Sequence, residues 1–270
     1  MNIVTAHQIA FFPWPGFIHK LMISDKFILM DLAQFRSRSF MHRNYISLNE
    51  KEYMVTMPIK DPKKSHIIRN LRFRECSNEL RSVLEKTFLQ IKISAANKHY
   101  KKEALDYIDY MIGILDKDES IKPLDLFIKE LNYIFGQLSV EAPNIILESQ
   151  FLRSDITYHK AQRFKSHADL LGADCYIVGI NALEYCGKQE LSTVCNSIYV
   201  QKFDYRSFQP YTPSKYCLSV LGLLPQLGWQ NLLDKLFDNN IGKCDLKKHA
   251  AEFKYGIGKD FSNYLQIFDH

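Results

Sequence analysis

His7 and Gln8 end an apolar run that begins at Ile3, and an aromatic, proline-rich stretch, FFPWPG, follows at 11–16. A histidine imidazole ionises near neutral pH and can act as a general base, and a glutamine amide can donate a hydrogen bond to a developing oxyanion. Pro15 suits the first position of a helix, because the N–H that it lacks has no helical partner there. The stretch therefore predicts a strand, a loop and a helix, with His7 and Gln8 as candidate catalytic residues.

The aromatic side chains of this loop allow two interpretations. Phe12 and Trp14 can stack on a sugar or a nucleotide base, which makes them candidate substrate-binding residues. Alternatively, Phe11, Phe12 and Trp14 cap the hydrophobic core, where large aromatic side chains are usually found. The N-terminus of the following helix favours phosphate, and it is expected at the sheet edge where ligands bind in α/β proteins.

A second group of polar residues follows the next apolar run, 27–30. Asp31 ends that run and can orient a catalytic base or bind an ammonium group. Asn44 can donate a hydrogen bond to an oxyanion, and Arg43 offers a guanidinium fork for phosphate. Alternatively, Asp31 and Arg43 pair with each other.

Arginines between these positions form a candidate anion site. If residues 34–40 are extended, Arg36, Arg38 and Phe40 share one face of the strand. Closely spaced guanidinium groups suit phosphate or carboxylate, so Arg36 is a candidate substrate-binding residue. The alternative is an edge strand whose arginines face solvent.

Composition and motifs exclude several classes. The chain has 270 residues, 46% hydrophobic, and a net charge of +5, which fits one large domain, or a domain with a subdomain, without a nucleic-acid arm. Six cysteines lack zinc-type spacing, and phosphate-loop, dinucleotide and nucleophile-elbow motifs are absent, so no metal and no bound cofactor is expected. His159, His167 and Asp169 are interpreted as solvated helix positions. No leader or membrane span is recognisable, which predicts a cytoplasmic protein with reduced thiols.

These residues need an α/β scaffold to position them. The sequence predicts a mostly parallel sheet with flanking helices and a helical insertion. Strands are expected at 2–7, 26–31, 53–59, 67–73, 144–149, 175–180 and 197–203. The predicted organisation is an N-terminal part of the α/β domain with the site at 1–76, a helical insertion at 77–142, the C-terminal part of the α/β domain at 143–227, and a helical C-terminal extension at 228–270.

The chain resembles the WbqC-like family at the residues discussed above. Matches to the family pattern are His7-Gln8, Phe12-Pro13-Trp14, Gly16-Phe17, Lys20, Ser24-Asp25, Asp31, Gln34-Phe35, Arg43-Asn44, Thr56-Met57-Pro58, Gly172-Ala173-Asp174, Gly179, Tyr185, Leu218-Ser219 and Gly228. The resemblance adds Lys20 and Gln34 to the candidate substrate-binding residues. Departures from the pattern are Ile9, His42, Val178 and Gly222, and Gly222 stands near a position that is often acidic.

The resemblance implies a function in O-antigen or surface-polysaccharide biosynthesis. Members of the family look like transferases that place glycine or a similar acyl group on an amino sugar, here expected as a nucleotide sugar. In that reaction His7 would be the base, Asp31 would orient it, and Gln8 or Asn44 would bind the oxyanion. The acyl donor stays open between a carrier-protein thioester, a coenzyme A ester, an adenylate and a charged tRNA.

Two other functions remain open at this point. A nucleotide-dependent ligase or nucleotidyltransferase can also use a histidine after the first strand, although the chain lacks the H-x-x-H arrangement around His7. A non-catalytic scaffold that binds sugar nucleotides would fit Gly222 in place of an acid.

Overall fold

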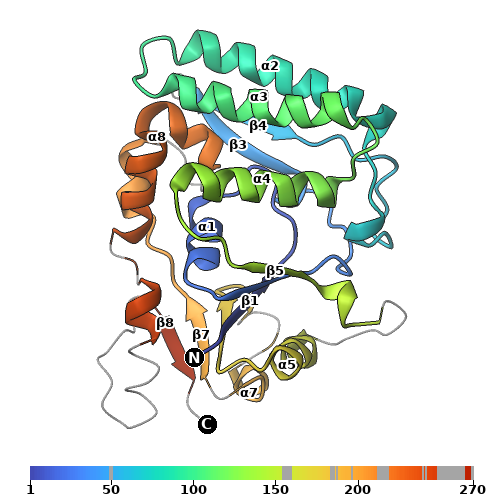
Figure 1. Cartoon of the computed structure of the whole chain (residues 1–270), viewed down its shortest axis with the longest axis vertical. Coiled ribbons are helices and arrows are strands. Elements are labelled where there is room, and N and C mark those ends of the chain that lie inside the picture. The colour runs from blue at the N-terminus through green and yellow to red at the C-terminus, as the bar shows by residue number, and fades with distance from the viewer. Residues whose placement is uncertain are drawn as a thin grey trace.

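The main feature of the computed structural model is a six-stranded sheet with the strand order β5-β2-β1-β6-β7-β8 (Figure 1). The structure describes residues 1–48, 51–153, 160–182, 186, 188–195, 197–211, 219–238, 240, 242–247 and 265–268. The sheet strands are β1 (Ile3–His7), β2 (Lys26–Leu29), β5 (Asn144–Leu147), β6 (Cys175–Gly179), β7 (Ser197–Gln201) and β8 (Leu265–Phe268). The first five in spatial order run parallel, and β8 is antiparallel to β7. The predicted α/β class with a mostly parallel sheet is confirmed.

The central strands are apolar on both faces because helices cover both sides of the sheet. Phe27 and Leu29 of β2 belong to the larger hydrophobic core, whereas Ile28 points into the core on the opposite face. The register pairs His7 with Leu29 and Leu29 with Leu147. The carboxyl ends of β1, β2 and β5 therefore meet at one edge of the sheet, which is where the sequence places its polar candidates.

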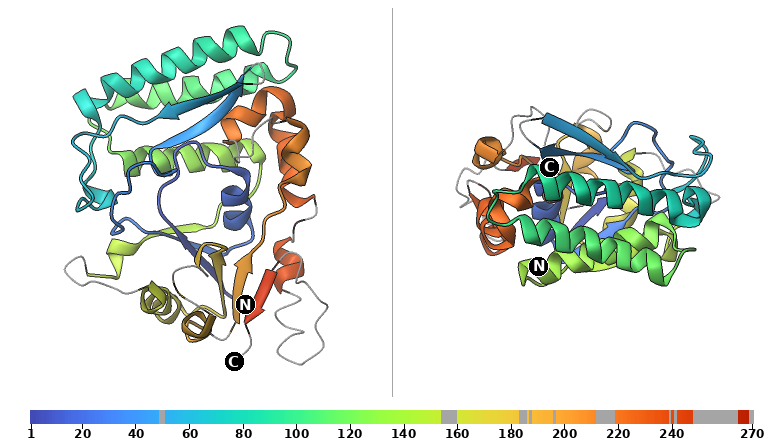
Figure 2. Two further views of the ribbon diagram at one scale, coloured as in Figure 1. Left: turned by 180° about the vertical axis from the view of Figure 1, so that it is seen from behind. Right: turned by 90° about the horizontal axis from the view of Figure 1, so that it is seen from above.

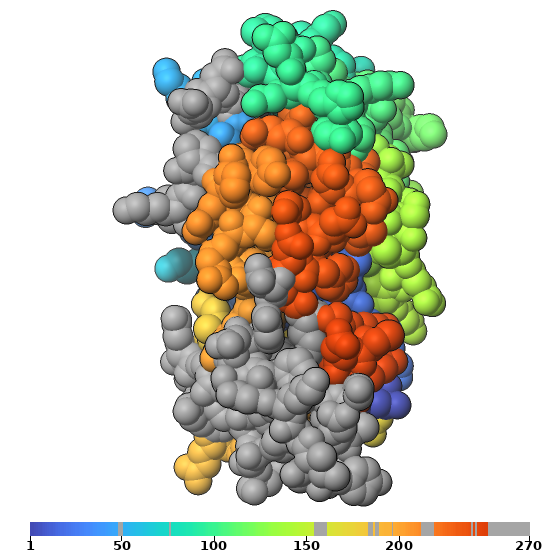
Figure 3. Space-filling model, turned by 90° about the vertical axis from the view of Figure 1, so that its left-hand side faces the viewer, coloured from blue at the N-terminus to red at the C-terminus, as the bar shows by residue number. Residues whose placement is uncertain are grey.

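One face of the sheet carries most of the helices (Figures 1 and 2). This layer contains α1 (Pro15–Met22), α2 (Asn78–Ser94), α3 (Lys101–Lys117), α4 (Pro123–Leu138) and α8 (Val220–Phe237), together with the hairpin of β3 (Arg43–Leu48) and β4 (Lys51–Thr56). The other face is covered by α5 (Lys160–Leu171) and α7 (Lys188–Ser192). In Figure 3, α8 lies directly below α2 and α3 and beside α4.

Short 3-10 turns connect several of these elements. They are η1 (Ile68–Asn70), η2 (Arg74–Ser77), η3 (Glu148–Gln150) and η4 (Arg206–Tyr211). Helix α8 is kinked at Gly228, whose φ of 65° is easiest for a residue without a side chain. A Cβ atom there would also lie 2.6 Å from the ring of Tyr100, so this position needs glycine.

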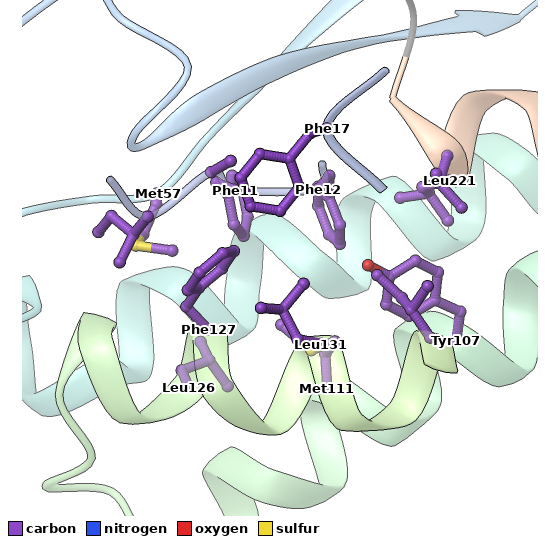
Figure 4. Close-up of a cluster of buried hydrophobic side chains, with 14 of the residues drawn as sticks. Phe11, Phe12, Phe17, Met57, Tyr107, Met111, Leu126, Phe127, Leu131 and Leu221 are labelled. Atoms are coloured by element: carbon purple, nitrogen blue, oxygen red, sulfur yellow. The ribbon is translucent and has the colours of Figure 1, made fainter. Parts of the chain in front are cut away.

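The larger core joins the first loop to the helical layer (Figure 4). Phe11 and Phe12 lie side by side, with ring centroids 4.2 Å apart, and both side chains are completely buried. They pack above Phe127 and Leu131 of α4 in Figure 4. The interpretation of these two phenylalanines as core residues is therefore correct.

The observed helices agree with the sequence predictions better than the segments around the β3–β4 hairpin do. The helices expected between 77 and 139 are present as α2, α3 and α4. The expected strand at 67–73 is wrong, because this stretch contains η1 and only isolated bridges, Gln34 to Ile67 and Ile59 to Phe73. Residues 34–40 are not extended either, since the chain turns there and Arg38 has a φ of 62°.

Two strands lie where the sequence predicted something else. β3 was not expected, and it pairs antiparallel with β4 outside the main sheet. β8 replaces part of the expected helical tail. Within the described residues, no helix combines the length and the apolar character that crossing a bilayer requires.

Candidate functional site

Buried side chains fix the shape of the loop between β1 and α1. The Asn44 amide nitrogen donates to the carbonyl oxygens of Phe11 (3.3 Å) and Phe12 (2.6 Å). The Phe12 N–H donates to Glu130 Oε1 at 3.2 Å, and the Phe11 N–H donates to the Phe40 carbonyl at 3.0 Å. Phe12 adopts a φ of 45°, which side-chain-bearing residues rarely do. The hydrogen bonds compensate for that backbone strain, so the loop is held in one conformation.

His7 lies at the carboxyl end of β1, half-buried, with its ring edge-to-face against Trp14 and Phe17. Its Nδ1 is 2.9 Å from the Gln8 carbonyl oxygen, which can only accept, so Nδ1 carries the hydrogen and Nε2 carries the lone pair. Burial and then the charge of Lys20 lower the pKa of His7 to about 3, and the bond to Gln8 offsets this only in part. The imidazole is therefore neutral at pH 7.

Lys20 is a buried cation without a counter-charge. It lies on α1 with 3% of its surface exposed, and its Nζ donates to the Ala6 carbonyl at 3.2 Å. Among the described residues, no carboxylate forms an ion pair with it. Burial lowers the pKa of Lys20 to about 7, so a large fraction of the amine is neutral at physiological pH. Such a lysine can accept a proton or act as a nucleophile, unlike a solvated one.

The structure corrects three of the predicted roles. His7 is not a base with a pKa near neutrality, because burial and Lys20 disfavour the imidazolium. Phe12 is completely buried and cannot stack on a ligand. Asn44 uses its amide N–H groups to hold the loop, so it positions the site and is not a donor for an oxyanion.

Asp31 is buried at the end of β2, and its Oδ1 accepts a hydrogen bond of 2.9 Å from the N–H of Ser149. It therefore ties the end of β2 to the end of β5. No ion pair between Asp31 and Arg43 is formed in the described part of the chain, so that alternative is wrong. Asp31 makes no described hydrogen bond to His7, and its role as an orienting group stays a prediction.

The remaining candidates lie towards the surface. Gln34 and Arg36 are exposed, whereas Gln8 and Arg43 are half-buried. Their roles in binding stay predictions. Trp14 is half-buried and packs against Phe40 with ring centroids 5.4 Å apart. Phe40 is 39% exposed, so the accessible aromatic surface next to His7 is formed by Trp14 and Phe40 instead of by Trp14 and Phe12.

A second polar cluster lies at the end of β5, and its buried carboxylate is paired with a cation and with a histidine. Glu148 accepts hydrogen bonds from Arg163 Nε at 2.5 Å and from His167 Nε2 at 2.8 Å. His167 Nδ1 is 2.9 Å from the Tyr176 hydroxyl, which donates to it, since Nε2 holds the imidazole hydrogen. Burial alone raises the pKa of Glu148, but the bonds from Arg163 and His167 outweigh it and leave the pKa below its usual value. Burial also lowers the pKa of His167.

The structure tests two of the three residues that were interpreted as solvated helix positions. His167 is completely buried and is not a solvated helix position. Asp169, by contrast, is exposed and pairs with Lys165 as a surface residue should. His159 lies outside the described residues. Within the described residues, no three His, Cys, Asp or Glu side chains are placed to hold a metal ion.

Glu130 is the polar residue that sequence reasoning missed. It lies on α4, completely buried, with Oε1 accepting from the Tyr107 hydroxyl at 2.5 Å as well as from Phe12. Its Oε2 has no hydrogen-bond partner among the described residues. Burial raises the pKa of Glu130 to about 8, which the two hydrogen bonds offset only in part. The available signal was a glutamate between Phe127 and Leu131, on the apolar stripe of the helix.

The departure at Gly222 has a steric explanation. Gly222 packs against β3, and a Cβ atom there would lie 3.0 Å from the Ile46 Cα. Its N–H donates to the Ser219 hydroxyl, which caps α8. This position contacts the hairpin backbone, so a side chain at 222 would require α8 to move away from β3.

Comparison with known proteins agrees with this picture at the level of the family. The sequence model of the WbqC-like protein family matches residues 8–233, which cover the site loop, the helical layer and most of α8. Searches of curated proteins and of solved structures found no match. The match covers more than half of the chain, and the protein therefore belongs to the WbqC-like protein family.

Proposed function

We propose that the protein transfers an acyl or aminoacyl group to the amino group of a sugar, at the site formed by His7 and Lys20. The observation that carries the proposal is the buried, uncompensated Lys20, with its pKa near 7, beside a neutral imidazole at the carboxyl edge of the sheet. Amine acylation needs a base that accepts a proton at neutral pH, and perturbed groups of this kind concentrate in active sites.

In the proposed reaction, His7 orients the attacking amine and Lys20 accepts its proton. The sugar amine attacks the carbonyl carbon of the donor, a C–N bond forms, and the bond from that carbon to the donor's sulfur or oxygen breaks. The half-buried His7 presents Nε2 as a hydrogen-bond acceptor that orients the amine. Neutral Lys20 takes the proton that the nitrogen loses, because its basicity exceeds that of His7. The leaving group then recovers that proton.

The acceptor is proposed to be a nucleotide-linked amino sugar of O-antigen or surface-polysaccharide biosynthesis, which would place the reaction in the cytoplasm. Membership of the WbqC-like protein family supports this choice. Trp14 and Phe40 offer an aromatic surface for the base or the sugar, and Arg36 and Arg43 offer guanidinium groups for the diphosphate.

The test is a mass-spectrometric assay of acyl transfer to a nucleotide-linked 4-amino sugar. Donors are glycyl-coenzyme A, a glycyl carrier-protein thioester, glycyl adenylate and glycyl-tRNA, each tried with the wild-type protein, Lys20→Met and His7→Ala. Lys86→Met on the exposed face of α2 is the matched control. We expect an acylated sugar from one donor, with loss of turnover in Lys20→Met and wild-type turnover in Lys86→Met.

Other outcomes contradict the proposal. Full turnover in Lys20→Met would remove the assignment of the base. If no donor gives product and the protein instead exchanges label between pyrophosphate and ATP, the reaction is that of a nucleotide-dependent ligase or nucleotidyltransferase. Binding of the nucleotide sugar without either reaction would favour a non-catalytic scaffold.

A further inference from the structure

The positive charge of the chain is concentrated in one segment beside the site. Residues 34–74 contain ten Lys or Arg and three Asp or Glu, a net charge of +7, whereas the whole chain carries +5. The other residues together are therefore net negative. A basic segment in an otherwise slightly acidic protein indicates a localised electrostatic footprint, which ordinary solubility does not require.

Backbone hydrogen bonds bring the two arms of this segment together. The Phe35 N–H donates to the His66 carbonyl at 2.7 Å, and the Arg69 N–H donates to the Asp31 carbonyl at 2.9 Å. The Phe11 N–H of the site loop donates to the Phe40 carbonyl at 3.0 Å. In Figures 1 and 2 the arm at 60–75 lies on the side of the molecule to which the carboxyl end of β5 points. The two arms thus form one basic face, 34–74, that borders the site.

Most cations of the basic face form no ion pair with a carboxylate among the described residues. Arg81 on α2, by contrast, is paired with both Glu85 and Asp116. Within the face, the described ion pairs involve Arg74 alone, which bonds to Glu79. Exposed cations of the face without an ion pair among the described residues are Arg36, Arg38, Lys51, Lys60, Lys63, Lys64, Arg69 and Arg72. Unpaired like charges repel one another, so an anionic partner would stabilise this surface.

We propose that the basic face binds RNA, namely the body of an aminoacyl-tRNA that brings its charged end to the His7 site. The inference rests on the proposed aminoacyl transfer and names its donor. The number of unpaired cations exceeds what the phosphates of one nucleotide can neutralise, which favours a polyanion. Most of the face's cations are arginines, which recognise phosphates bidentately, and exposed Phe40 on Trp14 offers a stacking surface for an unpaired base.

Fluorescence anisotropy of labelled tRNA with the full-length protein tests the proposal without needing turnover. The double variant Arg36→Gln/Arg38→Gln should weaken binding at least about tenfold and reduce the slope of log affinity against log salt by about 1 to 2. The control is the double variant Lys86→Gln/Lys92→Gln, which removes two exposed cations from α2 and should bind like the wild type. Thermal unfolding of each variant verifies that it is folded.

Poly-glutamate of matched charge distinguishes RNA from an acidic protein. If poly-glutamate competes as strongly as tRNA at equal charge, or if tRNA does not bind, the RNA assignment is wrong. Transfer from another donor without tRNA binding would overturn this inference and leave the proposed function standing. Binding of tRNA through the basic face, without transfer from any donor, would support this inference and contradict the proposed function.

Discussion

Two clusters of buried ionisable side chains lie at the same edge of the sheet, and they differ in whether the buried charge has a partner. At the end of β5, Glu148 is paired with Arg163 and His167, and His167 accepts a further hydrogen bond from the Tyr176 hydroxyl. At the end of β1, Lys20 is buried with one backbone acceptor and, in the part of the chain that the structure describes, no counter-charge. Burying an unpaired charge costs several kcal/mol, whereas a paired one costs far less.

We interpret the first cluster as structural and the second as the proposed functional site. The Glu148 cluster joins η3, α5 and β6, and its protons have fixed positions. The Lys20 site is held by a rigid loop, yet its protonation is balanced near neutral pH. Burial of an amine without a counter-charge lowers stability, and perturbed groups of this kind concentrate at functional sites, which is why the proposal places the reaction at Lys20.

The largest effect is expected from Lys20→Met, which should lower turnover by about 10² to 10⁴-fold while raising stability. The pKa of Lys20 is lowered in the folded protein, so the folded state binds fewer protons than the unfolded chain between pH 7 and 10.5. Wild-type stability is therefore lost as pH falls from 10.5 towards 7. Urea unfolding at pH 6.5 and pH 9.5 should show a gain for Lys20→Met that is larger at pH 6.5, by up to about 4 kcal/mol. An equal gain at both values would contradict a depressed pKa.

Glu148→Ala should have the opposite effect on stability. It leaves Arg163 and His167 without their acceptor, and breaking a buried ion pair costs about 3 to 5 kcal/mol. Asp169→Ala, which removes an exposed partner of Lys165, should change stability by less than about 1 kcal/mol. Urea unfolding at pH 7 checks both. Equal effects of the two substitutions would show that the cluster is not a structural one.

A smaller, pH-dependent effect is expected from Glu130→Gln. The pKa of Glu130 is raised in the folded protein to about 8, so its contribution to stability is present below about pH 4.5 and is lost as pH rises to about 8. Glutamine does not ionise, so the stability of Glu130→Gln relative to the wild type should increase between pH 5 and pH 7 by about 2 to 3 kcal/mol. Tyr107→Phe, which removes one hydrogen bond to the carboxyl, is the companion variant. A pH-independent difference would place the pKa of Glu130 in its ordinary range.

The sequence was informative where a pattern depends on local spacing. The apolar runs at β1, β2, β5 and β6 and the stripe of α2 that includes Leu80 and Leu84 predict buried strands and a helix, because both depend on nearby residues. The strand expected at 67–73 failed because alternation alone does not supply a partner strand, and its neighbours at 33–35 offer only isolated hydrogen bonds.

The sequence predicted that His7 lies at the carboxyl end of the first strand, but it did not predict its protonation state. The loop chemistry at His7 was visible, since its residue types are unusual for a core segment. The protonation state of His7 was not, because it depends on Lys20 thirteen positions away and on burial against Trp14 and Phe17. Asn44 and Glu130 clamp the loop from distant parts of the chain, and only the folded structure brings them to Phe12.

The most direct test of the central claim is the ionisation of Lys20, measured by NMR on protein with isotope-labelled lysines. The Lys20 signal is assigned by its loss in Lys20→Met, and its chemical shift is followed from pH 5 to pH 11. The account predicts a midpoint near pH 7 for Lys20, about three units below the value of an ordinary lysine side chain. A midpoint above 10 for Lys20 would show that its charge is solvated or paired, and the proposed base would be wrong.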